Sequence, residues 1–223
     1  MINVAIDGPS GAGKSSVAKA VAKRKGYIYV DTGALYRSIG LFVFRAGIDK
    51  SDKKAVISCL DKIDIKLEYR DGTQIVLLNG EDVSTDIRLP EISMYASSVS
   101  AIPEVRTFLL ELQRKMAREN DVIMDGRDIG TVILPDATVK IFMFASSEGR
   151  AQRRYKELIE KGVETTLEEV LSDMKKRDED DANRDVAPCV PAEDAIMLDN
   201  TKTNLEETID IVCKIIEDTI EGK

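Results

Sequence analysis

Residues 8–15 of this 223-residue chain carry the spacing G-x-x-x-x-G-K-[ST], the signature of a phosphate-binding loop. Glycines let the backbone coil tightly enough for successive N–H groups to point at one anion. Lys14 is a flexible cation that can reach the β and γ phosphates, and the Ser15 hydroxyl is a hard oxygen ligand for Mg²⁺. The residues predicted to hold the phosphates are Gly8, Pro9, Ser10, Gly11, Ala12, Gly13, Lys14, Ser15 and Ser16.

The segments on either side of this motif are those that such a loop requires. The apolar run Val4–Ile6 predicts a buried strand before it, and apolar residues at helical spacing between Val17 and Ala22 predict a helix after it. Gly26 is a helix stop. A glycine-rich turn beside a chance lysine would not have this strand–loop–helix order, so the sequence predicts a nucleotide site.

Composition narrows the classes of function. The net charge of −8 argues against a nucleic-acid surface as the main partner. The chain has no histidine, which excludes His-based triads and imidazole metal sites. Its three cysteines show no zinc or disulfide spacing, and we expect a reducing cytoplasm. We also expect no signal peptide and no membrane span.

A second anion site is indicated near Arg37. The strand pattern of residues 27–30 ends at Asp31-Thr32-Gly33, and a helix pattern follows from residue 34 to about 46. Arg37 falls in the first turn of that helix, where a cation opposes the helix dipole. An exposed surface arginine is the simpler interpretation, but ligands gather at the carboxyl ends of parallel strands.

The pattern then changes to alternation on both sides of Asp71-Gly72, a strong hairpin signal, and Asn79-Gly80 indicates another turn. We predict an antiparallel insert over residues 61–86 that borders the acceptor site. Two helices are predicted next, over about 90–101 and 103–119.

The segment 121–130, DVIMDGRDIG, predicts another buried strand that ends at Asp125. We expect Asp125 to reach the magnesium shell through a water, and Arg127 and Asp128 to project into the same cleft. A simple turn with an exposed Arg–Asp salt bridge is the alternative.

Residues 139–145 predict a further strand, and Ser146 is suited to cap the helix that follows it, which carries Arg150, Arg153 and Arg154. Residues 164–169, ETTLEE, start a further helix with residues suited to capping. The charged run 175–184 is typical of a solvated helix end. In a phosphate-loop protein, arginines on a mobile flap can also close over phosphates, and we predict such a lid over residues 150–190. Strands near residues 3, 28, 122, 140 and 196, separated by helices, predict an α/β fold with a five-stranded parallel sheet. The residues by themselves indicate a small-molecule phosphotransferase.

Four segments together resemble the bacterial cytidylate kinases, within the nucleoside monophosphate kinases, across nearly the whole chain. They are IDGPSGAGKS (6–15), DTGALYR (31–37), DGRDIGTV (125–132) and RDEDDANRDVAP (177–188). The resemblance implies a single domain over residues 1–223 with a three-layer P-loop kinase fold, in which the antiparallel insert lies beside the monophosphate and a helical lid covers the site. It also implies ATP as donor on residues 8–16, and CMP or dCMP as acceptor.

The resemblance further implies roles for individual residues. Lys14, Arg127 and Arg184 would be catalytic, and Ser15 would hold Mg²⁺, the expected cofactor. The implied CMP-binding residues are Thr32, Tyr36, Arg37, Ser97, Arg106, Gly126, Arg127, Asp128, Arg177, Asp181 and Arg184. Among these, the resemblance implies that Thr32, Arg37 and Arg127 hold the acceptor phosphate and that Ser97, Arg106 and Asp128 read cytosine. It implies that Arg177, Asp181 and Arg184 contact the sugar and phosphates of the monophosphate. Thr32 replaces a frequent serine and keeps its hydroxyl, whereas Asp180 stands where some relatives have an arginine, so this lid is less basic.

The expected activity is therefore transfer of the γ-phosphoryl group of ATP to CMP or dCMP by a cytoplasmic monomer, with no nucleic-acid or membrane partner. One alternative is another P-loop kinase acting on UMP, AMP or a shikimate-type alcohol. The other is a P-loop NTPase switch, although the chain lacks the N-K-x-D guanine motif.

Overall fold

The computed structural model describes residues 1–70, 73–160 and 162–222, which fall into two compact units. The first, here called the terminal unit, is Met1–Tyr27 with Asp121–Lys223. The second, the central unit, is Ile28–Asn120. Each unit carries one part of the predicted site and is described separately.

The fold contains a five-stranded parallel sheet of order β2-β6-β1-β7-β8 and a three-stranded antiparallel sheet of order β3-β4-β5. Both sheets were predicted. The strands of the terminal unit are β1 (Asn3–Asp7), β6 (Val122–Asp125), β7 (Val139–Phe144) and β8 (Ile196–Asp199). Those of the central unit are β2 (Ile28–Asp31), β3 (Ile65–Arg70), β4 (Thr73–Leu78) and β5 (Glu81–Asp82).

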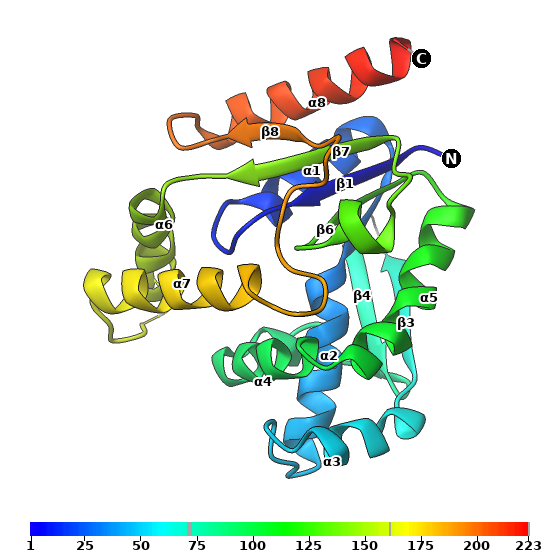
Figure 1. Ribbon diagram of the computed structural model, residues 1–223, viewed down its shortest axis with the longest axis vertical. Coiled ribbons are helices and arrows are strands. Elements are labelled where there is room, and N and C mark those ends of the chain that lie inside the picture. Colours follow the sequence, from blue (N-terminus) through cyan, green and yellow to red (C-terminus); the bar gives the residue numbers. More distant parts are fainter. Residues whose placement is uncertain (71–72, 161, 223) are drawn as a thin grey trace. The chain divides into compact units, whose positions relative to one another are not determined.

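β1 is the middle strand of the five-stranded sheet, between β6 and β7 (Figure 1). Val4 pairs in register with Ile123 of β6 and with Val139 of β7. Val4, Ala5 and Ile6 have no exposed surface. The continuous apolar run follows from this position, because a strand covered on both faces has no polar side.

Helices α1 (Lys14–Lys25) and α8 (Leu205–Glu221) pack against each other in the terminal unit. Arg24 in the last turn of α1 pairs with Glu206 and Asp210 of α8. These exposed pairs contribute little stability.

The predicted lid contains α6 (Ser147–Glu160) and α7 (Leu167–Ala182), which pack through Ala151, Val170 and Met174. Thr166 and Glu169 form a capping box at the start of α7, as the sequence pattern indicated. The charged run 175–184 is mostly the C-terminal half of this helix. A five-residue π-helix, η3 (Ile129–Ile133), follows β6 and was not predicted.

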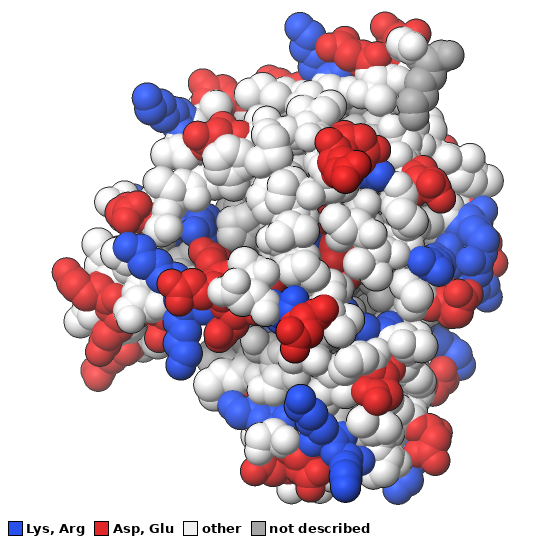
Figure 2. Space-filling model, in the orientation of Figure 1, with Lys and Arg blue, Asp and Glu red and all other residues white. Residues whose placement is uncertain are grey.

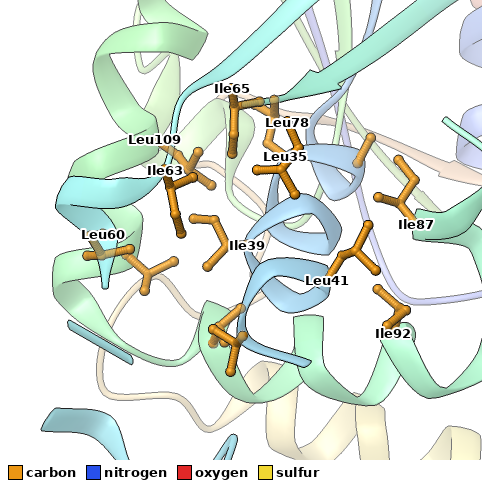
Figure 3. Packing of buried hydrophobic residues seen from close by; sticks show 14 of the residues in the cluster. Leu35, Ile39, Leu41, Leu60, Ile63, Ile65, Leu78, Ile87, Ile92 and Leu109 are labelled. Carbon is orange, nitrogen blue, oxygen red and sulfur yellow. The ribbon is translucent and has the colours of Figure 1, made fainter. Parts of the chain in front are cut away.

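The central unit has a core of its own around α2 (Thr32–Arg45), shown in Figure 3. Leu35 and Ile39 of α2 are fully buried there with Leu109. Gly40 lets α4 (Pro90–Ser100) approach closely, because a Cβ at Gly40 would lie 2.9 Å from the Ala96 nitrogen. The remaining helices are α3 (Lys53–Ser58), η1 (Leu60–Lys62), η2 (Asp86–Arg88), α4 (Pro90–Ser100) and α5 (Pro103–Glu119).

Two details of the central unit bear on the predictions. α2 begins at Thr32, two residues earlier than predicted, because the Asp31 side chain accepts a hydrogen bond from the Ala34 nitrogen and caps the helix. The Asn79-Gly80 turn is confirmed, and both of its residues have positive φ. The Asp71-Gly72 turn lies outside the described residues.

Figure 2 shows Lys and Arg interspersed with Asp and Glu over the face in view. Within the described part of the chain, no helix combines the length and the apolar composition that crossing a membrane would require.

Candidate active site

The phosphate loop follows the carboxyl end of β1 and leads into α1. A Cβ at Gly8 would lie 2.0 Å from the Met143 carbonyl oxygen, and one at Gly11 would lie 2.7 Å from the end of the Met174 side chain. Both glycines have positive φ, of 141° and 72°. A larger residue at position 8 would therefore force the loop away from the β7 backbone. At position 11 the end of the Met174 side chain can move, so the positive φ is the main reason for glycine there.

Lys14 is the first residue of α1, and it is 5% exposed. Its Nζ donates a 2.7 Å hydrogen bond to the Pro9 carbonyl oxygen, so the side chain curls over the loop. Burial, with repulsion from Arg127 in second place, lowers the pKa of Lys14 to about 7 despite attraction from Asp125. A lysine with this pKa gains a full charge when an anion arrives beside it.

Ser15 and Asp125 lie side by side, as the prediction of a shared metal site requires. The Ser15 hydroxyl donates a 2.7 Å hydrogen bond to Asp125 Oδ2, joining the start of α1 to the end of β6. A hydroxyl and a carboxylate are hard oxygen donors, and they fit Mg²⁺, which takes one or two protein oxygens and completes its shell with phosphates and water. No group of three or more acidic, cysteine or histidine side chains suited to a metal occurs among the described residues.

Three predicted site residues form a charged cluster at the end of α7. Arg127 Nε donates a 2.9 Å hydrogen bond to Asp181 Oδ2, and Arg184 Nη2 donates to Asp181 Oδ1. Burial raises the pKa of Asp181, but attraction from Arg127 and Arg184 outweighs it, so the pKa lies below its usual range. Arg177 is exposed on α7 and acts on Asp181 in the same sense. Arg127 thus pairs with Asp181, and Asp128 is buried, which argues against the alternative of a simple turn with an exposed Arg–Asp salt bridge.

In the central unit, Asp31 organises the predicted acceptor-phosphate residues. Asp31 is 5% exposed, and its Oδ2 accepts hydrogen bonds from Arg37 Nη2 at 2.8 Å and from Arg88 Nη2 at 3.3 Å. Thr32, the first residue of α2, is buried next to it. Arg37 is therefore paired with a buried carboxylate, unlike the exposed surface arginine that was the simpler interpretation of the sequence.

The other predicted CMP-binding residues of the central unit lie on three helices, with Tyr36 on α2, Ser97 on α4 and Arg106 on α5. The Arg106 guanidinium lies 5.5 Å from the centre of the Tyr36 ring, a cation–π contact, and Nη1 donates to the Ser100 carbonyl oxygen at 2.9 Å. Ser97 lies one turn earlier on α4, where it is exposed. Gly126 and Asp128 belong to the terminal unit: the Gly126 carbonyl oxygen accepts from Arg127 at 3.3 Å, and Asp128 is 4% exposed.

The family profile described as cytidylate kinase matches residues 4–218 of the chain. The chain belongs to the cytidylate kinase family. It is 50% identical over 222 residues to the cytidylate kinase of Caldanaerobacter subterraneus subsp. tengcongensis, covering 100% of this chain and 97% of that one. The cytidylate kinase of Caldicellulosiruptor bescii is 47% identical over 222 residues, with 100% and 98% covered. That of Caldicellulosiruptor saccharolyticus is 50% identical over 214 residues, with 96% and 95% covered.

Solved structures support the fold. An uncharacterized protein from Eubacterium ventriosum superposes with a TM-score of 0.55 at 16% identity, covering 97% of this chain and 99% of that one. A gluconokinase from Sinorhizobium meliloti reaches a TM-score of 0.50 at 16% identity, with 99% and 94% covered. These similarities show the fold alone.

Asp7 is a site residue of this cytidylate kinase family member that sequence reasoning missed. It ends β1 just before the phosphate loop, and its carboxylate accepts hydrogen bonds from the Ile129 nitrogen at 2.8 Å and the Gly130 nitrogen at 2.7 Å. Burial raises the pKa of Asp7 to about 6, although these two hydrogen bonds oppose the change. Asp7 thus ties the loop to η3. The sequence does contain one signal for Asp7, which is an acidic residue directly after the apolar run Val4–Ile6.

In the sequence, Arg150 is one of several arginines on its helix. It is 3% exposed, and Nη1 donates to the Ser10 carbonyl oxygen at 2.8 Å while Nη2 donates to Asp178 Oδ2 at 2.7 Å. One guanidinium therefore joins the phosphate loop, α6 and α7. No local pattern distinguishes Arg150 from exposed arginines such as Arg154, because the contacts come from segments far along the chain.

Proposed function

We propose that the protein transfers the γ-phosphoryl group of ATP to CMP or dCMP, giving ADP and CDP or dCDP. The observation that carries the proposal is the buried Lys14 at the end of a glycine loop, in a chain that matches the cytidylate kinase family over residues 4–218. This family membership favours a cytidine monophosphate over the other acceptors considered from the sequence.

The loop residues 8–16 hold the phosphates of ATP. On binding, Lys14 exchanges its Pro9 hydrogen bond for oxygens of the β and γ phosphates. Ser15 would hold Mg²⁺, with Asp125 reaching it through a water, and the bound ion would neutralise charge on the donor phosphates. The N–H groups of the loop and the positive end of the α1 dipole also favour binding of the ATP phosphates.

The acceptor is already an ionised phosphate near neutral pH, so this chain needs no general base. Thr32, Arg37 and Arg127 hold the acceptor phosphate, and Ser97, Arg106 and Asp128 read the base. Tyr36 also binds CMP. A carboxylate such as Asp128 can accept from the exocyclic amine of cytosine.

The cluster at the end of α7 supplies the remaining positive charge. Arg127 and Arg184 stabilise the charge that spreads over the equatorial oxygens during transfer, while Arg177 and Asp181 bind the nucleotide. In the free protein Asp181 neutralises part of these arginines. Phosphate competes with that carboxylate, so substrate releases Arg127 and Arg184 at the moment when they are needed. We expect the enzyme to act as a monomer in the cytoplasm.

An acceptor panel tests the proposal directly. ATP consumption is measured in a coupled assay with CMP, dCMP, UMP, AMP, shikimate and no acceptor. CMP and dCMP should give the highest rates. Faster turnover of another acceptor, or hydrolysis that ignores the acceptor, would overturn it.

Two variants separate the donor and acceptor sides. Lys14→Ala should lower turnover by about 10²-fold or more while the protein stays folded, because the charge on the transferring phosphate is lost. Asp128→Ala should raise the KM for CMP and leave the KM for ATP largely unchanged. Arg24→Ala, on the exposed face where α1 meets α8, is the matched control and should change neither constant.

A further inference from the structure

Arg88 lies beside the predicted acceptor-phosphate residues, although neither the sequence motifs nor the family match drew attention to it. It is the last residue of η2, directly before Leu89 and the start of α4. Its Nη2 donates to the same oxygen of Asp31 that accepts from Arg37, at 3.3 Å and 2.8 Å. Two guanidinium groups therefore converge on one carboxylate oxygen.

The charges in this cluster do not balance. Asp31 supplies one negative charge to two arginines, and its other oxygen, Oδ1, is occupied by the Ala34 nitrogen. Arg45, in the same unit, shows the opposite balance of charge. This one arginine pairs with two carboxylates on the surface, those of Glu81 and Asp86. Asp31, Arg37 and Arg88 together keep a net positive charge, as a site for an anion requires.

Hydrogen-bond donors are also left over. The Arg37 Nε–H is buried, and no partner for it occurs among the described residues. A buried N–H without an acceptor is costly, which points to an acceptor supplied by a ligand. Arg88 holds Asp31 through Nη2 alone, while its side chain is 56% exposed against 8% for that of Asp31. The outer N–H groups of Arg88 can therefore reach an incoming molecule.

The backbone around these arginines leaves room for them. A Cβ at Gly33 would lie 2.9 Å from Arg37 Nη1 and 3.2 Å from Asp31 Oδ1. Glycine at this position lets the Arg37 guanidinium fold back over the first turn of α2. Asp31 is in turn fixed as the cap of that helix, so it holds both guanidinium groups from a rigid point.

We propose that Arg88 binds the acceptor phosphate together with Arg37, as a second guanidinium aligned by Asp31. This inference rests on the proposed function, because it takes the ligand to be a nucleoside monophosphate. A phosphate monoester carries nearly two negative charges and several acceptor oxygens, which suit a pair of arginines better than one.

The test compares a ligand with and without the phosphate. Binding of CMP and of cytidine is measured by calorimetry for the wild-type protein, Arg88→Ala and Arg88→Lys. Arg118→Ala is the matched control, because Arg118 lies in the same unit, on α5, and is similarly exposed at 60%. Steady-state KM values for CMP and ATP are measured on the same proteins.

Arg88→Ala should weaken CMP binding by about tenfold or more, the usual effect of losing a charged hydrogen bond, and should leave cytidine binding within twofold. The KM for CMP should rise, whereas that for ATP should not. Arg88→Lys should recover part of the CMP affinity, and Arg118→Ala should match the wild type.

Equal losses for CMP and cytidine would show that Arg88 only supports the local structure, and unchanged CMP binding would show that it plays no part; either result overturns the inference. Failure of the proposed function is seen separately, in the acceptor panel on the wild-type protein. If another monophosphate is the preferred acceptor, that monophosphate and its nucleoside replace CMP and cytidine, and the same comparison decides the role of Arg88.

Discussion

The Asn200 side-chain amide donates a 2.8 Å hydrogen bond to the Ala12 carbonyl oxygen, joining the segment after β8 to the phosphate loop. Asn200 is 4% exposed, and its backbone N–H donates to the Phe144 carbonyl oxygen at the end of β7. The loop is therefore held from a residue 188 positions away in the sequence.

We expect Asn200→Ala to lower the free energy of unfolding by about 1–3 kcal/mol, because a buried carbonyl loses its donor. Asn200→Asp has nearly the same shape but places a carboxylate against that carbonyl, so it should cost more. Urea unfolding of both variants checks the order. An aspartate variant as stable as the wild type would contradict the role given to the amide.

Gly8→Ala tests the close approach of the loop to β7. The added Cβ would meet the Met143 carbonyl oxygen at 2.0 Å, and we expect a loss of more than about 3 kcal/mol in stability together with loss of ATP binding. Gly26→Ala is the control, because Gly26 also has positive φ but no atom lies within 4 Å of the position that a Cβ would take there. It should cost only about 1–2 kcal/mol. Thermal unfolding that shows similar losses for both would rule out the steric argument.

The lowered pKa of Lys14 predicts proton uptake when ATP binds. Burial favours the neutral amine in the free protein, with a pKa of about 7, and bound phosphate raises that pKa again. Affinity for ATP should therefore fall as the pH rises above 7. At pH 8, calorimetry in two buffers of different ionisation enthalpy should show uptake approaching one proton.

Lys14→Arg provides the control for this measurement, since arginine stays charged at pH 8. Uptake should disappear in that variant, and the pH dependence of its residual binding should flatten. The same uptake in both proteins would assign the proton to another group.

Asp7 predicts a pH dependence of stability. Its pKa is about 6 in the folded protein against 3.8 for the ordinary side chain, so the folded state binds more protons between these values. The contribution of Asp7 to stability is therefore most favourable below pH 4 and falls by up to about 3 kcal/mol as the pH rises to 6.

Urea unfolding at several pH values between 4 and 7 checks this, with Asp7→Asn as the comparison. The difference in unfolding free energy between the two proteins should change across that window and become constant above it. A difference that stays flat throughout would mean that the Asp7 pKa is ordinary.

Local patterns in the sequence determined much of this protein. The order strand, glycine loop, helix identifies the phosphate site, and helix and strand boundaries follow from periodicity and capping residues such as Thr166. Such features depend on neighbours within a few residues, which is why they can be read from one chain. The residues of the cytidylate kinase motifs were recognised for the same reason.

Only the tertiary structure decided which side chains meet. The hydrogen bond from Ser15 to Asp125 spans 110 positions, that from Ile129 to Asp7 spans 122, and that from Arg88 to Asp31 spans 57. A buried carboxylate looks like an exposed one in sequence, because burial depends on segments that pack over it from elsewhere in the chain. Packing also turns the charge of Arg127 toward Asp181, and it lowers the pKa of Lys14. The residue types came from the sequence, but their partners and their protonation were set by the fold.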